Sequence, residues 1–544
     1  MSDNLARALG VLGALGAGYT LSESVKLKSD VENLKKISPY EEADYIVFIG
    51  DNGRIYAKNG STGMIEYSDA DATKVIQYAI DRSKNGGVVA LKPGTYYIKP
   101  QFMYHLQNRP YAVGLTTDGA DGLIIEGNGA KLVADVGTEI ILYVLNTSNS
   151  IIRNLVFDGN KGVQTWTYID GKALLLAGGV RYNNRYENIT VVNARGDGIY
   201  FGNHKPDEYG GGEQPEYNAV IRNIVSYNNA DVGQAGVILD ACVNTIAENI
   251  ISYNDRIGLQ ITSPSNHPYP LIVKGVQILD AKYIGITDFY GNAELYDVAM
   301  YASDSQYFDE AFIKFIYPNA RIKIEGLYID ASKVALGNSE GTTSYYPVWA
   351  TVSASGNPLE LIIRNAYIKT PTTGVSVAIR VFDNVNAHLE NIKIVARYGF
   401  SIGGSSYKSS AIINNAEVSG VSAVAFNALY TTMYVYNVLT PSFKVYARSD
   451  ALAVFDKPYP GLQPEIDIAG LRFLKNSGVA TIVAGSTKAT VSHRLTTTPN
   501  KVLITPLASP PGKLWVENIT STSFDIVTDT APTTDLNVSW QAEV

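Results

Sequence analysis

The sequence of 544 residues contains a single cysteine, Cys242, so no disulfide bond can form within one chain. It also has few histidines, and these are scattered, at His105, His204, His267, His388 and His493. A zinc site needs several such ligands close together, and the sequence offers no cluster of that kind. The fold therefore cannot depend on an intrachain disulfide, and we predict no zinc site.

Charged residues are also scarce, at 18% of the chain, and the net charge is −8. An acidic chain of this kind argues against nucleic acid or an anionic membrane as the main partner. Hydrophobic residues make up 46%, which is typical of a folded, strand-rich protein. Tyrosine is in excess, with 37 residues against 15 phenylalanines, and it suits both half-buried strand faces and sugar-binding surfaces.

A degenerate repeat runs through the middle of the chain: alternating apolar residues, then asparagine or glycine, then further alternation. The markers are Gly127, Asn154, Asn188, Asn223, Asn249, Gly275, Gly326, Asn365, Asn391 and Asn415, and their shortest spacings are 24 to 27 residues. An apolar period of two within such a repeat predicts a β-solenoid rather than helical repeats. Asparagine suits a bend with left-handed backbone angles, and stacked asparagines can form hydrogen-bonded ladders.

An amphipathic helix is predicted over Asp71–Asp81, and Gly86–Ile98 is typical of a strand, a Pro-Gly turn and a strand. A helix here would cap the open first coil. This segment resembles the N-terminal cap of the pectate-lyase-like β-helix superfamily, which covers polysaccharide lyases, polygalacturonases and phage tailspikes. The resemblance spans roughly Asp69 to Ala425. It implies an all-β fold built on a right-handed, single-stranded parallel β-helix, in a superfamily of diverse functions.

Two flanking segments, residues 45–69 and 490–544, look like parts of tailspike proteins from spindle-shaped archaeal viruses. That resemblance implies a virion protein that reads a glycan or glycoprotein on the host surface. It also implies attachment to other tail proteins through the N-terminal segment. Many tailspikes of this fold are trimers, so a homotrimer is the expected assembly.

The chain is predicted to have five parts: a helical docking segment (1–40), a small β head (41–70), the β-helix (71–440), a proline-containing linker (441–476) and an antiparallel β-sandwich (477–544). The apolar stretch Leu9–Leu21 is short and glycine-rich for a transmembrane span. A weak signal peptide and a simple packed helix are the alternatives for it. In the sandwich, Trp515 and Trp540 fit either the core or a sugar-stacking surface.

Aspartates cluster between residues 158 and 255, and the catalytic candidates are Asp158, Asp170, Asp197, Asp231 and Asp255. Asp197 lies nine residues after Asn188, and Asp231 lies eight after Asn223, so we predict that both share one face of consecutive coils. Coils stack about 4.8 Å apart, so such a column can supply the carboxylate spacing of a glycosidase. For each aspartate, ordinary turn chemistry is the structural alternative.

An insertion at Gly202–Tyr217 predicts a loop on the binding face, and the candidate substrate-binding residues are Tyr200, His204, Glu208 and Glu213. The Gly-Asp-Gly-Ile sequence around Asp197 resembles the acidic stretch of polygalacturonases. It lacks that family's second aspartate, and the downstream Gly-His-Gly is absent. The polygalacturonase mechanism therefore does not transfer directly.

Three functions compete at this point. The first is a tailspike in the virion tail that binds a host-surface glycan, with or without cleaving it. The second is a secreted polysaccharide hydrolase or lyase, and the third is an adhesive β-helix without catalysis. Hydrolysis by two carboxylates needs no cofactor, whereas a lyase would need a base and usually calcium, with Asp158, Asp197 and Asp231 as candidate oxygen ligands.

Overall fold

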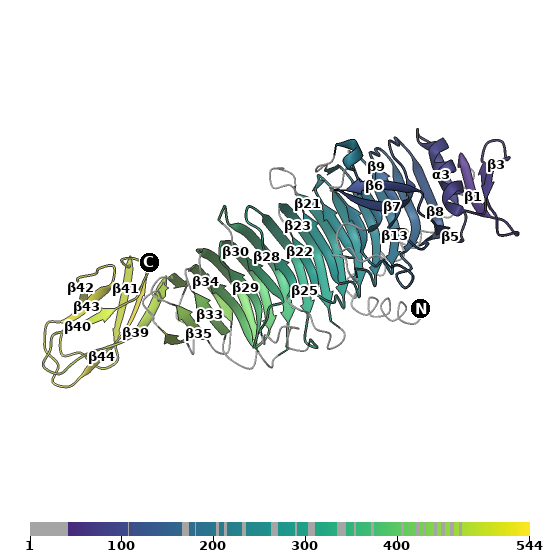
Figure 1. The fold of residues 1–544 in the computed structure, drawn as a ribbon. Coiled ribbons are helices and arrows are strands. Elements are labelled where there is room, and N and C mark those ends of the chain that lie inside the picture. The colour runs from purple at the N-terminus through teal and green to yellow at the C-terminus, as the bar shows by residue number, and fades with distance from the viewer. Residues whose placement is uncertain are drawn as a thin grey trace, which may run out of the picture.

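The computed structural model describes residues 42–544 except 107, 166–172, 180, 203–205, 211–214, 231–234, 263–269, 289–290, 303–310, 335–343, 353–354, 372–374, 404–406, 420–423, 429–430, 440–442, 448–451, 457–461 and 467–470. These residues form an elongated rod of stacked coils with a small β-domain at its C-terminal end (Figure 1). Within them, no helix is long and apolar enough to cross a membrane. The helical segment predicted over 1–40 lies outside the described residues.

One long parallel sheet, the first sheet, runs the length of the rod. Its coil strands are β8 (Ile124–Ala134), β10 (Ile151–Asp158), β13 (Arg185–Val192), β16 (Val220–Tyr227), β19 (Ile246–Tyr253), β21 (Leu271–Leu279), β23 (Asn292–Tyr301), β25 (Arg321–Asp330), β28 (Leu359–Lys369), β30 (Val385–Val395), β32 (Ser409–Ser419), β34 (Thr431–Leu439), β36 (Leu452–Phe455) and β38 (Leu471–Phe473). Each strand pairs in parallel with the strand one coil away.

A second sheet lies across the coil and is made of β6 (Phe102–Leu106), β7 (Arg109–Thr116), β9 (Ile140–Leu145), β11 (Ala173–Gly178), β14 (Asp197–Phe201), β17 (Val237–Asp240), β20 (Ile257–Thr262), β22 (Ile284–Asp288), β24 (Ala311–Phe315), β27 (Val348–Thr351), β29 (Val375–Phe382) and β31 (Tyr398–Gly403). Short strands β12 (Arg181–Tyr182), β15 (Glu216–Tyr217) and β18 (Cys242–Val243) form a third sheet. Apolar side chains from the first two sheets fill one continuous core. This architecture confirms the predicted parallel β-helix.

The asparagine markers occupy the bends of the first sheet. Asn188 and Asn223 have positive φ angles of 56°, and the other markers except Gly127 share this left-handed conformation. After the first member of each run, every side-chain amide donates to the asparagine of the preceding coil, at 2.7 to 3.0 Å; the runs are Asn154–Asn188–Asn223–Asn249 and Asn365–Asn391–Asn415–Asn437. A second ladder runs through Asn149, Asn183, Asn218 and Asn244. The predicted ladders are confirmed, and they hold neighbouring coils in register.

Charges of opposite sign alternate along the outer side of the first sheet. The aligned positions are Glu126, Arg153, Glu187, Arg222, Glu248 and Lys274. The Nε–Oε2 distances are 2.6 Å for Arg153–Glu126 and 2.9 Å for Arg222–Glu248. If a strand paired with the strand two coils away, like charges such as those of Arg153 and Arg222 would lie side by side. The alternation therefore favours the observed pairing of neighbouring coils.

Glycines mark the sharp turn into the second sheet. An added Cβ at Gly198 would lie 2.4 Å from the carbonyl oxygen of Gly236 on the next coil. An added Cβ at Gly236 would lie 2.1 Å from an oxygen of Asp255. Because real Cβ atoms do not approach so closely, these two positions accept only glycine without rearrangement.

The N-terminal end of the rod is closed by a helix and a small antiparallel unit. Strands β1 (Tyr45–Ile49), β2 (Ile55–Asn59) and β3 (Ile65–Asp69) pair with one another, and β1 also pairs in parallel with β4 (Val88–Leu91). The predicted helix is α3 (Ala72–Ser83), and the Asp71 carboxylate accepts the Thr73 N–H at 3.0 Å as its N-cap. Its apolar face packs into the core, with Val75, Ile76, Ala79 and Ile80 buried. The head is therefore part of the cap.

At residues 441–476 the structure differs from the predicted linker. This segment carries β35 (Phe443–Ala447), β36, β37 (Leu462–Ile466) and β38, which stack in parallel on earlier coils. The prolines suggested a connector, yet Pro464 lies within β37, whose described pairing is with β35 alone. Proline is tolerated there because an edge strand does not need every N–H.

The C-terminal domain has two three-stranded antiparallel sheets. One contains β39 (Lys475–Ile482), β44 (Leu536–Glu543) and β41 (Lys501–Pro506), and the other contains β40 (Lys488–Ser492), β43 (Ser523–Thr528) and β42 (Leu514–Glu517). Trp540 is buried between them, with its ring 5.5 Å from that of Phe524, whereas Trp515 is 39% exposed. This is the predicted sandwich, and Trp540 belongs to its core.

Candidate functional site

The outer face of the second sheet presents a row of side chains, one from each coil. Ile199 and Phe201 of β14 point into the core, so Tyr200 between them points outward. Strand register continues the row through Thr116, Tyr143, Leu176, Tyr200, Ile238, Gln260, Thr287, Lys314, Trp349, Arg380 and Ser401. We call this row and its flanking residues the outer face.

The N-terminal part of the outer face is covered by the hairpin β6–β7 and by part of the predicted loop. Tyr104 of the hairpin packs edge-on against Tyr143, with ring centroids 5.4 Å apart. The 3₁₀ turn η1 (Asp207–Tyr209) docks on the same hairpin, and Glu208 Oε1 lies 2.6 Å from His105 Nδ1. Asp207 accepts the backbone N–H of Asn108 at 2.6 Å.

Two loop residues have shifted pKa values because of these contacts. Partial burial raises the pKa of Glu208, but the hydrogen bonds from His105 outweigh it and hold the pKa below its usual value. The phenol of Tyr209 donates to Asp118, and this bond together with partial burial raises the pKa of Tyr209 well above its usual value. Glu208, predicted to bind substrate, thus helps to fix the loop on the hairpin.

Tyr200, also predicted to bind substrate, lies on the outer face and is only 8% exposed. Its hydroxyl donates to Asp240 Oδ2 at 2.5 Å, across one coil. The pair lies on β14 and β17, and Tyr200 belongs to the same apolar cluster as Leu106 and Tyr111 of the hairpin.

Asp197 begins β14 and is 1% exposed. Its register neighbours Ala173 and Ala235 belong to the same apolar cluster as Tyr200, on the outer side of the sheet. Asp197 Oδ1 accepts the N–H of Ala235 at 3.0 Å. Asp240 lies five residues beyond Ala235, so it is roughly 16 Å from that end of the strand. Asp197 and Asp240 are therefore too far apart for a direct glycosidase pair.

The predicted alignment of Asp197 with Asp231 does not follow the observed register. Ile199 pairs with Val237, so the position opposite Asp197 is Ala235, four residues after Asp231. The turn between the two sheets is longer in this coil, so equal distances from the asparagine marker do not give equal positions on the second sheet. Asp231 itself lies outside the described residues, as do Asp170, His204 and Glu213.

The other two candidate aspartates, Asp158 and Asp255, make contacts within the fold. Asp158 ends β10 on the first sheet, where its carboxylate is 2.5 Å from Lys131 Nζ and accepts the N–H of Asn160 at 2.9 Å. Asp255 is fully buried and accepts hydrogen bonds from Ser226, Ser252 and the Asn229 N–H at 2.6, 2.7 and 2.7 Å. Asp255 has no surface that could meet a glycan.

Sequence reasoning missed the C-terminal half of the outer face. Lys314, Trp349 and Arg380 lie there on adjacent strands and are half-exposed. Lys314 Nζ lies 4.9 Å from the Trp349 ring, and Arg380 Cζ lies 4.5 Å from the Tyr346 ring. The sequence pattern that could have revealed this region is the recurrence of basic and aromatic residues at outward strand positions. It occurs in coils whose asparagine or glycine marker is weak.

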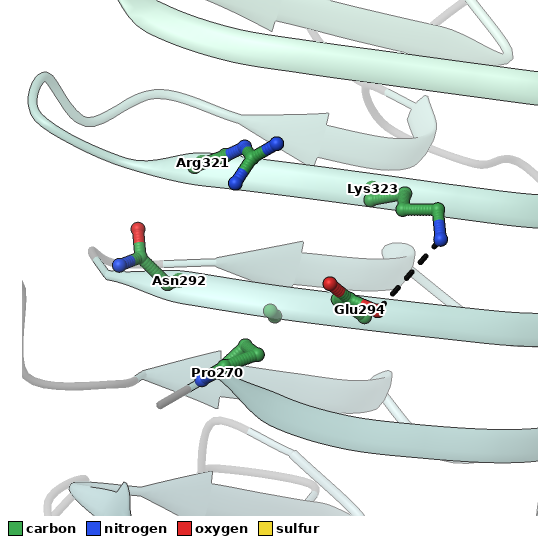
Figure 2. A pocket seen from close by; sticks show the side chains of 6 residues that line it. Pro270, Asn292, Glu294, Arg321 and Lys323 are labelled. Atoms are coloured by element: carbon green, nitrogen blue, oxygen red, sulfur yellow. Dashed lines mark ion pairs between the residues drawn. The ribbon is translucent and has the colours of Figure 1, made fainter. Parts of the chain in front are cut away.

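The described residues contain no group of three or more acidic, histidine or cysteine side chains that could hold a metal ion. A pocket lies on the first sheet, lined by Pro270, Asn292, Ala293, Glu294, Arg321 and Lys323 (Figure 2). Glu294 and Lys323 form an ion pair across it at 3.8 Å. Arg321 lies 3.4 Å from Glu360, so both cations of this pocket already have carboxylate partners.

Comparison with solved structures finds the same architecture. The tailspike protein of E. coli bacteriophage HK620 in complex with a pentasaccharide has a TM-score of 0.51, with 12% identity over 95% of this chain and 94% of that one. A variant of that tailspike in complex with a hexasaccharide has a TM-score of 0.50, with 11% identity over 87% and 89% of the two chains. Both are phage tailspikes. At this identity the likeness shows the fold.

No protein-family model matches the chain. No curated protein matches its sequence either.

Proposed function

We propose that this chain is a viral tailspike that binds a glycan on the host surface along the outer face of the second sheet. The observation that carries the proposal is the row of Lys314, Trp349 and Arg380, whose rings and charges lie one coil apart on a rigid sheet. Half-exposed aromatic and basic side chains held at fixed spacing can contact several sugars of an extended chain. The fold likeness to tailspikes solved with bound saccharides supports the same reading.

The test is binding of the purified full-length chain to envelope polysaccharide and glycoprotein from the host. We expect Trp349→Ala to weaken binding at least tenfold, in line with loss of a buried aromatic contact. Trp515→Ala, which removes an exposed tryptophan from the C-terminal domain, is the matched control and should bind as wild type. Absence of binding to any host glycan by the wild-type chain would refute the proposal.

Attachment to the particle forms the second part of the proposal. Residues 1–40 would dock on other tail proteins, and three chains would associate. The resemblance of residues 45–69 and 490–544 to tailspikes of spindle-shaped archaeal viruses supports such a virus as the source. A secreted polysaccharide hydrolase or lyase is the alternative, and particles lacking this chain would distinguish the two by failing to adsorb to the host.

Cleavage of the bound glycan is a second candidate activity. It is favoured by the Asp197 carboxylate, which lies on the outer side of the second sheet in the same strand as Tyr200. We keep Asp197 and Asp231 as the residues to test, with one as general acid and the other as base. Release of oligosaccharides from host glycan by the wild type, but not by an Asp197→Asn/Asp231→Asn variant, would support this assignment. Release by both would remove these residues from the mechanism.

A further inference from the structure

The geometry points to an acidic sugar as the ligand of the C-terminal half of the outer face. We propose that Lys314, Trp349 and Arg380 form a subsite for a sugar that carries a carboxylate or a sulfate. This inference rests on the proposed function, because it names the chemical class of glycan that the same face would take.

The first observation is how the charges are held. Arg380 Cζ lies 4.5, 4.7 and 5.6 Å from the ring centroids of Tyr346, Phe382 and Trp349. Lys314 Nζ lies 4.9 Å from the Trp349 centroid. The tryptophan ring is therefore flanked by cations on two adjacent coils. A sugar that contacts the exposed part of the Trp349 side chain would therefore also lie close to both cations.

The second observation is the contrast with the first sheet. Many cations there are paired with carboxylates, as in Arg153–Glu126, Arg222–Glu248, Arg364–Glu390 and Lys393–Glu417. Among the described residues, no carboxylate lies within ion-pair distance of Arg380. Although the net charge of the chain is −8, the Arg380 guanidinium packs against aromatic rings and not against a carboxylate of the described residues.

The third observation concerns solvent. Lys314, Trp349 and Arg380 are half-buried, so the cations have lost part of their hydration. Burial also lowers the pKa of Lys314, which means that its charge is held at some cost. An anionic group that reached both cations would offset that cost, and charge interactions are stronger in such a partly dry site than in water. The guanidinium fork suits carboxylate and sulfate oxygens in particular.

The experiment uses full-length protein and host envelope glycan in three forms: untreated, with its carboxylates amidated by methylamine and carbodiimide, and with its sulfates removed by solvolysis. The two treated forms distinguish the source of the negative charge. The proteins are the wild type, Arg380→Gln, Lys314→Gln and the control Lys393→Gln. The control removes one charge from the first sheet, where Lys393 Nζ lies 3.2 Å from Glu417. Thermal melting confirms that each variant is folded.

We expect one of the two treatments to weaken wild-type binding roughly tenfold or more, the loss typical of one charge-assisted hydrogen bond. Arg380→Gln and Lys314→Gln should each lose a similar factor on untreated glycan and lose little more on the treated form. Lys393→Gln should behave as wild type. If Arg380→Gln does not fold, Lys314→Gln and the treated glycans still decide the outcome.

Two other outcomes separate the inference from the function on which it rests. If the wild type binds all three glycan forms equally, or if both variants keep the preference for the untreated form, the acidic subsite is refuted and the glycan-binding function stands. If the wild type binds none of them, both are refuted.

Discussion

At the scale of single residues, the rod interior contains a titratable group. Burial raises the pKa of Asp255 to about 6, and hydrogen bonds from Ser226, Ser252 and Asn229 only partly offset that effect. In an unfolded chain the same carboxyl titrates near 4. The folded state therefore binds this proton more tightly than the unfolded state does. The contribution of protonated Asp255 to the free energy of unfolding is complete below the unfolded pKa and is lost as the pH rises through about 6.

We predict that the free energy of unfolding falls by up to about 3 kcal/mol between pH 4 and pH 7 because of this group. Asp255→Asn should flatten that part of the pH dependence, as measured by denaturant unfolding at a series of pH values. Asp51→Asn, in the exposed turn after β1, is the control and should keep the wild-type dependence. An unchanged slope in Asp255→Asn would show that the buried carboxyl does not titrate in this range.

A buried ion pair is the second residue-scale case. Arg181 and Glu216 are both fully buried, and they join β12 to β15 on successive coils. Removing one partner leaves the other charge uncompensated, so Glu216→Gln should cost about 3–5 kcal/mol of stability. The double variant Arg181→Met/Glu216→Met should recover most of that loss, as measured by denaturant unfolding. A double variant less stable than Glu216→Gln would contradict this account.

At the scale of elements, the asparagine ladder combines backbone geometry with hydrogen bonding. Asn223 has a φ of 56° and bonds to Asn188 and Asn249. Asn223→Gly would lose the two bonds but keep the backbone geometry, whereas Asn223→Ala would also carry left-handed strain. We predict that the alanine variant is less stable than the glycine variant by about 1 kcal/mol, as measured by denaturant unfolding. Equal stability would mean that the φ angle contributes nothing.

These elements show why the fold could be predicted and the site only in part. The apolar alternation and the marker asparagine are local signals, and each recurs in every well-marked coil. The site depends instead on the length of each turn between the sheets. Ala235, not Asp231, stands opposite Asp197, and no single-sequence spacing reveals that shift. Lys314, Trp349 and Arg380 align only once the register of β24, β27 and β29 is known.

At the scale of the whole molecule, both ends of the described rod are covered. Helix α3 closes the first coil, and the C-terminal domain closes the last (Figure 1). Phe473 of β38 donates its N–H to Arg494 at 2.9 Å, and its carbonyl accepts from Thr496 at 3.0 Å. The final strand edge is thereby hydrogen-bonded to the sandwich rather than left open.

We predict that a chain ending at Leu474 self-associates through the uncovered edge of β38, because unpaired strand edges recruit other strands. Light scattering after size-exclusion chromatography should show larger, concentration-dependent species than the full-length chain forms. A truncated chain with the same size distribution as the full-length chain would show that the sandwich does not protect the edge.

The parallel stacking of coils also has a mechanical consequence. In each coil the hydrogen bonds between strands point along the rod. A tensile load between the two ends therefore falls on all the hydrogen bonds of a coil interface at once, and no single bond carries it alone. A rod of this build transmits a pull from one end to the other with little extension.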